Sequence, residues 1–207
     1  MGLHNYLVYV RKLNNMGRWA TEFMHQRTTV SEHSFLVAQI GQMLALIEEE
    51  NGGKVDWGRL FRKLINHDVI ESITGDILST TKYKNPEIAS ALSVIEKELA
   101  EETFFAEMEQ PYRSLYRNLL FDGKDDSLEG RILRAADNID ALMECIFEVK
   151  LNNIGLFEEK YHAILKKLKE SNLVSVRYFI ANVLPGLVAD CERLAKKTTK
   201  YKKEEER

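Results

Sequence analysis

His67 and Asp68 are adjacent in a segment whose neighbours are apolar, and together they can bind a divalent metal. Adjacent side chains of a helix point about 100° apart, so two of them can hold one ion that lies between their directions. Glu71 follows one turn later on the same side. A metal lowers the pKa of its bound water, and a nearby carboxylate can position or deprotonate that water. These residues predict a hydrolytic metal site, although an exposed helix edge would give the same pattern.

His33, Asp137 and Asp140 are further candidates for ligands. His33 lies at the start of a predicted helix that Ser31 could cap, so a structural role is the alternative for this histidine. On a helical wheel, Asp137 lies at the border of an apolar face and Asp140 lies further inside it. A carboxylate near a buried face needs a partner, and a metal is one such partner. Periodicity alone does not choose between the two aspartates.

The combination of His33, His67, Asp68 and Asp137 would provide two nitrogen and two oxygen ligands. This mixture suits one divalent ion such as Mn, Co, Fe, Ni, Zn or Mg, with water and a substrate oxygen in the remaining positions. The chain has only 5 histidines. The others show no paired spacing with these ligands: His4, His25 and His162. The sequence therefore favours a single metal over a histidine-rich binuclear centre.

Helices must position these residues, because apolar side chains recur at three- and four-residue spacing along the chain. This period predicts helices over 3–13, 31–50, 56–74, 85–105, 111–120, 126–150, 156–170 and 173–196. Asp56, Asn85 and Asp126 are the predicted N-caps, and Pro185 should kink the last helix. No alternating strand of useful length occurs, and the chain has only 3 prolines. The pattern predicts a compact all-α bundle.

The bulk properties indicate one soluble domain that spans residues 1–207, with a polar and frayed tail over 197–207. The net charge of -3 gives no basic excess that would favour a nucleic acid polymer as partner. Cys145 and Cys191 lie in apolar helical patterns and are interpreted as reduced thiols. No signal peptide and no run of about 20 apolar residues is present. A cytoplasmic protein without a membrane span is therefore expected.

The ordered set of motifs resembles the HD-domain phosphohydrolase superfamily and, within it, the bacterial 5′-deoxynucleotidases. The likeness covers nearly the whole chain at similar spacing. The motifs that carry it are Gly17–Arg18–Trp19, Arg27–Thr28, Val30–Ser31–Glu32–His33–Ser34, His67–Asp68 with Glu71, Thr74–Gly75–Asp76, Lys82–Tyr83 and Ala135–Ala136–Asp137.

This resemblance implies an HD-domain helical bundle that is commonly a homodimer. It implies hydrolysis of a deoxyribonucleoside 5′-monophosphate to the deoxynucleoside and phosphate, with one divalent metal. It places the catalytic carboxylate on Glu71, and it favours Asp137 over Asp140 as a ligand. The implied metal ligands are His33, His67, Asp68 and Asp137.

The resemblance also implies a substrate site. Arg18 would neutralise the phosphate and take part in catalysis, a role that suits a guanidinium, and Trp19 would pack on the sugar and exclude a 2′-hydroxyl. A surface cation and a core aromatic are the alternatives for these two residues. Asp76 would bind the sugar 3′-hydroxyl or hold the attacking water. The implied substrate contacts are Arg18, Trp19, His33, Asp68, Asp76, Ile77, Leu78, Ser79, Lys82 and Asp137.

One segment departs from the family pattern. Relatives carry an Asp-Leu-Pro-Thr-Pro sequence where this chain has Asp76–Ile77–Leu78–Ser79–Thr80–Thr81. Proline fixes φ and stiffens a loop, so its absence leaves the rigidity of this loop, and with it the substrate preference, open. The predicted metal site is untouched by the change.

Other activities of the same superfamily are alternatives: a nucleotide pyrophosphohydrolase, a cyclic-nucleotide phosphodiesterase or a di-iron oxidase. The scarcity of histidines argues against the oxidase. A non-catalytic helical module that binds a nucleotide or a protein is an alternative from another class. Such a module could tolerate the loss of Glu71 or Arg18, and both residues are present.

Overall fold

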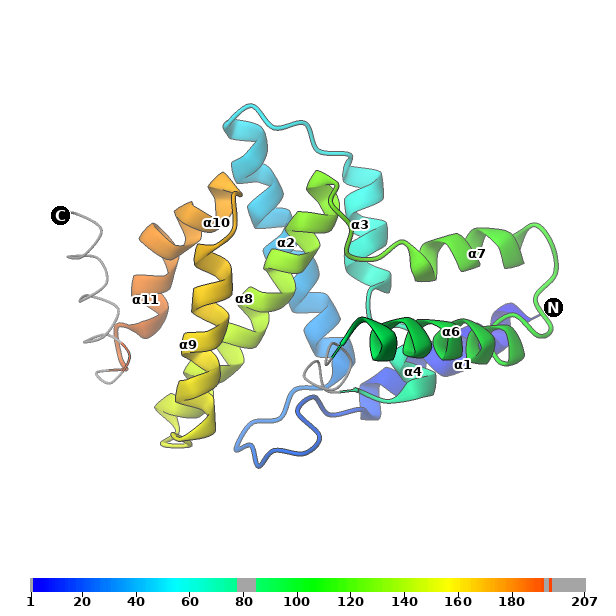
Figure 1. The fold of residues 1–207 in the computed structure, drawn as a ribbon, viewed down its shortest axis with the longest axis horizontal. Coiled ribbons are helices and arrows are strands. Elements are labelled where there is room, and N and C mark those ends of the chain that lie inside the picture. Colours follow the sequence, from blue (N-terminus) through cyan, green and yellow to red (C-terminus); the bar gives the residue numbers. More distant parts are fainter. Residues whose placement is uncertain (1, 78–84, 192–193, 195–207) are drawn as a thin grey trace.

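The computed structural model describes residues 2–77, 85–191 and 194, and in these residues the chain is helical (Figure 1). Leu78, Ser79 and Lys82, three of the predicted substrate contacts, lie outside the described residues. Within the described ranges the only β-type pairing is an isolated bridge between Gly17 and Thr29. The all-α prediction is therefore confirmed. The elements are α1 (Leu3–Lys12), η1 (Leu13–Asn15), α2 (Val30–Glu50), α3 (Trp57–Asn66), α4 (Glu71–Thr74), α6 (Pro86–Glu102), α7 (Tyr112–Phe121), α8 (Leu128–Lys150), α9 (Leu156–Lys169), α10 (Val174–Tyr178), η2 (Phe179–Val183) and α11 (Leu184–Val188).

The helices pack around two groups of buried apolar side chains. The larger group joins α2, α3, α8, α9, α10 and α11, and α8 lies at its centre between α2 and α9 (Figure 1). The smaller group joins α1, α6 and the segment before α4, where Val69 and Ile70 pack with Tyr6, Phe104 and Phe105. The segment that carries His67 and Asp68 therefore runs from one core to the other.

Two of the predicted N-caps are confirmed. The Asp56 side chain accepts the Arg59 N–H at 2.9 Å at the start of α3. The Asn85 side chain accepts the Ile88 N–H at 2.8 Å, and Pro86 occupies the first turn of α6. Both caps satisfy N–H groups that have no partner inside the helix.

Two other cap predictions were wrong, because a neighbouring hydroxyl residue has the better register. Thr29, not Ser31, caps α2: it accepts the Glu32 N–H, and the Glu32 carboxylate accepts the Thr29 N–H at 2.7 Å. This reciprocal capping box fixes the first turn of the helix that carries His33. Ser127, not Asp126, caps α8 by accepting an N–H three residues later.

The predicted helix over 56–74 is not continuous. α3 ends at Asn66, and the following N–H groups bond three residues back, from Val69 to Asn66 and from Glu71 to Asp68, before α4 begins. His67 Nδ1 contacts the Leu64 carbonyl at 2.8 Å, an oxygen that would accept the Asp68 N–H in a regular helix. His67 and Asp68 thus lie in a tight turn between two helices and not within one.

The last predicted helix, over 173–196, is also interrupted. A π-helical turn, η2, separates α10 from α11, and Pro185 lies in the first turn of α11. Proline lacks an N–H and cannot donate a hydrogen bond to the previous turn of a helix. The π-helical turn therefore lies just before Pro185, where the sequence predicted a kink. In the described part of the chain, no helix has the length and apolar character needed to cross a membrane.

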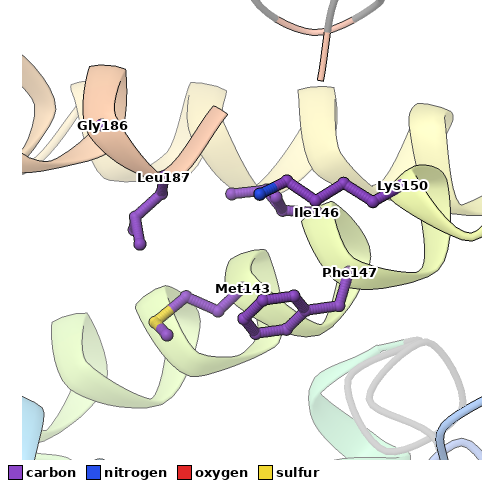
Figure 2. A pocket seen from close by; sticks show the side chains of 6 residues that line it. All are labelled: Met143, Ile146, Phe147, Lys150, Gly186 and Leu187. Atoms are coloured by element: carbon purple, nitrogen blue, oxygen red, sulfur yellow. The ribbon is translucent and has the colours of Figure 1, made fainter. Parts of the chain in front are cut away.

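A small pocket lies between α8 and α11 (Figure 2). It is lined mainly by apolar side chains, together with the stem and amine of Lys150. The lining residues are Met143, Ile146, Phe147, Lys150, Gly186 and Leu187. Because it holds a single titratable group, this pocket offers no set of residues for acid–base or metal chemistry.

Candidate metal and substrate site

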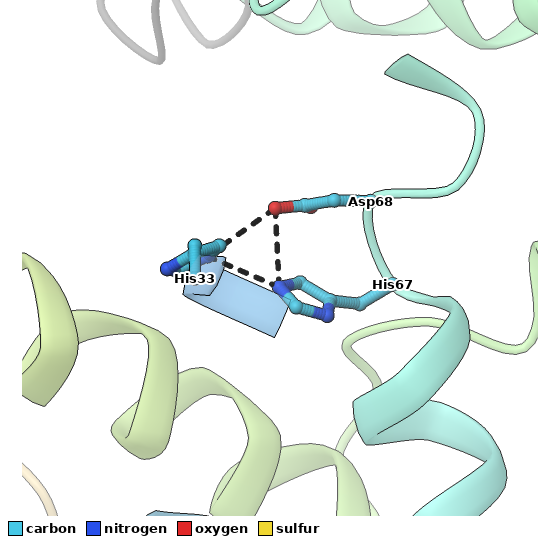
Figure 3. A group of neighbouring side chains, drawn as sticks. All are labelled: His33, His67 and Asp68. Atoms are coloured by element: carbon cyan, nitrogen blue, oxygen red, sulfur yellow. Dashed lines mark hydrogen bonds and ion pairs between the residues drawn. The ribbon is translucent and has the colours of Figure 1, made fainter. Parts of the chain in front are cut away.

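His33, His67 and Asp68 converge from α2 and from the turn after α3 (Figure 3). His33 Nε2 lies 3.3 Å from His67 Nε2 and 3.3 Å from Asp68 Oδ2, and His67 Nε2 lies 3.1 Å from Asp68 Oδ2. One ligand atom from each residue lies within 4.8 Å of the others. The arrangement therefore brings two imidazole nitrogens and a carboxylate oxygen to a single point.

The partners of the two Nδ1 atoms define the tautomers of these histidines. His33 Nδ1 lies 2.6 Å from Asp140 Oδ2, and His67 Nδ1 lies 2.8 Å from the Leu64 carbonyl oxygen. A carbonyl and a carboxylate only accept hydrogen bonds, so both Nδ1 atoms carry the proton. The two Nε2 atoms face each other 3.3 Å apart, and each is the atom that a metal between the rings can take as a ligand in place of a proton. The donor set fits a divalent metal.

Asp137 and Asp140, which periodicity could not separate, lie on opposite sides of His33. Asp137 Oδ1 is 3.3 Å from Nε2, on the side of the histidine and aspartate cluster, and Asp137 also pairs with Lys124. Asp140 is buried against Nδ1. Asp137 is thus placed where it could complete a ligand set, whereas Asp140 orients the His33 ring.

The electrostatics of the cluster favour a bound cation. Burial lowers the pKa of His33, but the hydrogen bonds that Asp137, Asp140 and Asp68 accept from its ring outweigh burial and hold that pKa well above the usual range, so this environment stabilises a positive charge at the ring. Burial opposes the ionisation of Asp68, yet His67 and His33 keep its pKa well below the usual value. The pKa of Asp137 is also lowered, because Lys124 and then His33 outweigh its burial. The carboxylates therefore stay charged around the two histidines.

Glu71 is the first residue of α4, beside this cluster. Its Oε2 atom is buried and has no hydrogen-bond partner among the described residues. Burial, followed by the charges of Asp68 and Asp76, raises the pKa of Glu71 to about 9, against the smaller effects of Arg18 and His33. A carboxyl group in this environment can hold a water molecule or exchange a proton with it.

Arg18 and Trp19 are partly buried, which disfavours both a freely solvated cation and a fully enclosed core aromatic. Arg18 Nε donates to both carboxylate oxygens of Glu144 at 3.2 Å, and Trp19 Nε1 donates to one of them at 2.8 Å. The Trp19 N–H donates to Asp76 Oδ2 at 3.2 Å, so these two predicted substrate residues meet although they lie far apart in the sequence. Ile77 follows Asp76 and is partly buried.

The acidic face of α8 was missed as a set by the sequence prediction. Asp137, Asp140, Glu144 and Glu148 follow one another at three- and four-residue spacing, which places them on one face of the helix. Glu148 accepts the N–H groups of His25 and Gln26 at 3.0 and 2.9 Å and so holds the segment between Trp19 and α2. The available indication was that all four residues are acids on a helix whose other buried positions are mostly apolar, where a buried acid needs a partner.

A buried lysine, Lys63, was also missed, and it holds the loop before α8. Its Nζ donates to the Gly123 carbonyl at 2.8 Å and to Asp125 Oδ2 at 3.1 Å, and it pairs with Asp122. This loop carries Lys124, the partner of Asp137. The contacts thus connect the interior of α3 to the edge of the candidate metal site.

Several known proteins resemble this chain in sequence and in fold. A family model described as 5′-deoxynucleotidase YfbR-like matches residues 5–187. A 5′-deoxynucleotidase of Photorhabdus laumondii is 27% identical over 194 residues, which is 93% of this chain and 98% of the relative.

Two solved structures extend the comparison. An HD-domain phosphohydrolase of Listeria innocua superposes with a TM-score of 0.84 at 35% identity, covering 95% of this chain and 93% of its own. The HD phosphohydrolase DatZ of cyanophage S-2L, solved with dA and one catalytic Zn²⁺ ion, has a TM-score of 0.55 at 18% identity, covering 92% of this chain and 96% of its own. At that identity the second likeness concerns the fold alone. The predicted HD-domain helical fold is confirmed.

Proposed function

The chain belongs to the YfbR-like 5′-deoxynucleotidase family, and from this membership we propose that it hydrolyses deoxyribonucleoside 5′-monophosphates to a deoxynucleoside and phosphate. The observation that carries the proposal is the pair of Nε2 atoms of His33 and His67 that face each other, with Asp68 beside them. Two imidazole nitrogens 3.3 Å apart beside a carboxylate are a donor set that suits a divalent cation. Metal-assisted hydrolysis is the chemistry that such a site supports.

We assign one divalent ion to His33, His67, Asp68 and Asp137, with Mn, Co, Fe, Ni, Zn and Mg as candidates. When bound, this ion supplies a Lewis acid for the phosphate and its attacking water. The chain must then orient both reactants. A bound cation would lower the pKa of Glu71, whose buried Oε2 lacks a partner in the described ranges, and the ionised carboxylate would hold the water and take up its proton.

The remaining residues would bind the substrate. Arg18 would balance the charge that develops on the phosphate, since it remains a cation at every relevant pH. Trp19 would lie against the sugar, and Asp76 would bind the 3′-hydroxyl or help to hold the water. We also propose substrate contacts for the residues that follow Asp76 in the sequence, namely Ile77, Leu78, Ser79 and Lys82.

A cytoplasmic homodimer is the proposed state of the protein. Cys145 and Cys191 are both free and buried, which agrees with a reducing compartment. The dimer is carried over from the family resemblance, and light scattering after size-exclusion chromatography tests it. A mass of one chain, 23.9 kDa, would contradict this part of the proposal.

Phosphate release from deoxy- and ribonucleoside 5′-monophosphates, measured with each candidate metal, tests the activity. We expect orthophosphate and a nucleoside as products, and faster release from the deoxy series. Pyrophosphate release from a triphosphate, or cleavage of a cyclic nucleotide, would favour the rival phosphohydrolases. Glu71→Gln should keep its metal and fold but lose activity. Full activity of this variant would reject the assigned role of Glu71, and absence of activity in the wild type would support a binding module.

A further inference from the structure

We propose that Glu144 is a positioning residue that holds Arg18 and Trp19 as one unit and thereby sets the selectivity for deoxyribose. The inference rests on the proposed function, because it assumes that Arg18 and Trp19 contact the phosphate and the sugar. Glu144 lies on α8, and its side chain is only 6% exposed. It would act through these two residues and would not itself touch the substrate.

The Glu144 carboxylate accepts hydrogen bonds from three side chains of the segment before α2. Arg18 Nε donates to both oxygens at 3.2 Å, Trp19 Nε1 donates to Oε2 at 2.8 Å, and the Thr28 hydroxyl donates to Oε1. A buried carboxylate with several donors is held firmly, and each donor is held by it in turn. Three side chains from two short stretches thus share one anchor.

Arg18 is anchored in a way that leaves its end available. Only Nε contacts Glu144, and neither terminal Nη atom has a hydrogen bond within the part of the chain that the structure describes. The two Nη groups form the fork that binds a phosphate through two parallel hydrogen bonds. Burial opposes the charge on Arg18, but Glu144, and after it Asp137 and Asp68, raise its pKa. The guanidinium is therefore a fixed cation beside the ligand cluster.

Trp19 is held at both of its polar ends. Its backbone has a φ of 54°, which is rare for a side chain of this size and persists only where the surroundings fix it. Asp76 accepts the backbone N–H, Glu144 accepts the indole N–H, and the ring packs edge-on against Phe157 at 5.9 Å. Lys160 lies 4.2 Å above the ring. With the indole N–H bound, the ring plane cannot rotate freely.

Glu144 holds these side chains, whereas other residues hold their backbone. Arg27 Nη1 donates to the carbonyls of Arg18 and Trp19 at 2.6 Å each, and the Arg18 N–H donates to the Thr28 carbonyl at 3.0 Å. Loss of the Glu144 charge should therefore release two side chains without unfolding the segment. Discrimination against one hydroxyl group depends on small displacements of such a wall, so selectivity should respond strongly.

The test compares Glu144→Gln, which keeps the shape and removes the charge, with the wild type and with Glu148→Gln. The last variant changes a carboxylate one turn along α8 that contacts neither Arg18 nor Trp19. We measure kcat and KM for a deoxynucleoside 5′-monophosphate and its ribonucleotide, together with metal content and Tm. In Glu144→Gln we expect kcat/KM for the deoxynucleotide to fall about 10-fold or more, and the deoxy-to-ribo ratio to fall at least about 5-fold, with metal retained. Glu148→Gln should keep the ratio.

An unchanged deoxy-to-ribo ratio in Glu144→Gln, with an active wild type, would overturn the inference and leave the proposed function intact. No phosphate release by the wild type from any nucleoside monophosphate would overturn both. Thr28→Val removes one donor to Glu144 and nothing from the substrate side, so it decides the matter if Glu144→Gln does not fold. For Thr28→Val we expect the deoxy-to-ribo ratio to fall, but by less than the fall expected for Glu144→Gln. A ratio equal to that of the wild type would reject the role of Glu144.

Discussion

Asp140 Oδ2 lies 2.6 Å from His33 Nδ1, and this contact turns the Nε2 atom of His33 toward His67. A carboxylate behind a ligand histidine fixes its tautomer and increases its basicity. Asp140→Asn should therefore weaken metal binding about 10- to 100-fold without removing a ligand. Titration against a competing chelator measures this effect. Asp126→Asn, a change on an exposed side chain near the start of α8, is the control and should bind metal like the wild type.

Removal of a proposed ligand should abolish binding altogether. Purified wild-type protein should carry about one divalent ion per chain, and its Tm should rise when metal is added, because a ligand that binds only the folded state stabilises it. His67→Ala and Asp68→Ala should lose both the ion and the rise in Tm. His4→Ala changes an exposed histidine on α1 and should retain both. Full metal content in the two ligand variants would reject the site.

Replacement of Glu71 should stabilise the metal-free protein in a pH-dependent way. The pKa of Glu71 is raised from 4.5 to about 9 in the folded protein. Between these values the unfolded chain releases the proton while the folded chain keeps it, so folding loses stability as the pH rises. Glu71→Gln removes this penalty and should gain about 1–3 kcal/mol near pH 8, with the gain vanishing toward pH 4.5. Urea unfolding after chelator treatment at both pH values measures it.

Glu71→Gln should also lower the rate of phosphate release by about 100-fold or more, because the general base is lost. A variant that is more stable and less active than the wild type would agree with a carboxyl group retained for chemistry at the expense of the fold. An equal stability difference at both pH values would contradict the raised pKa. Glu50→Gln, on an exposed residue at the end of α2, provides the matched control for the loss of a glutamate charge.

Lys63→Met should destabilise the loop before α8. Lys63 Nζ is buried and contacts Gly123, Asp122 and Asp125, so its removal leaves a carbonyl and two carboxylates without this partner. We expect a loss of about 1–3 kcal/mol in the free energy of unfolding, measured by the urea midpoint. Lys54→Met, on an exposed side chain, should change that free energy by no more than about 0.5 kcal/mol. Equal midpoints for the two variants would exclude the anchoring role.

The sequence predicted the helices well where local signals agreed. Asn85 and Pro86 begin α6 as expected, because a cap and a first-turn proline act on the same turn. The errors in the caps arose where two nearby residues could each act as the N-cap, as with Thr29 and Ser31 at the start of α2. The break after Asn66 was missed because the apolar period continues through it, while the interruption depends on a histidine side chain.

The candidate site was only partly accessible to local patterns. Asp137 and Asp140 are three residues apart and share a helix face, so only the contact with His33, 107 residues away from Asp140, distinguishes them. Glu144 and Glu148 find their partners more than 110 residues away, in the segment before α2. Such pairings follow from how the helices pack, which the period of a single helix does not contain.

The contacts of the acidic face of α8 depend on the spacing of its residues as well as on their identity. Each residue advances a helix by about 1.5 Å and about 100°, so Asp137 and Glu144 are separated by about 10 Å along the axis. A single inserted or deleted residue between Asp137 and Glu148 would turn part of this face away from its partners and disrupt several contacts together. A substitution changes one contact and leaves the others in register. Under the roles proposed for Asp137 and Glu144, substitutions on α8 would change metal affinity and sugar selectivity separately, whereas a change in the length of the helix would change both.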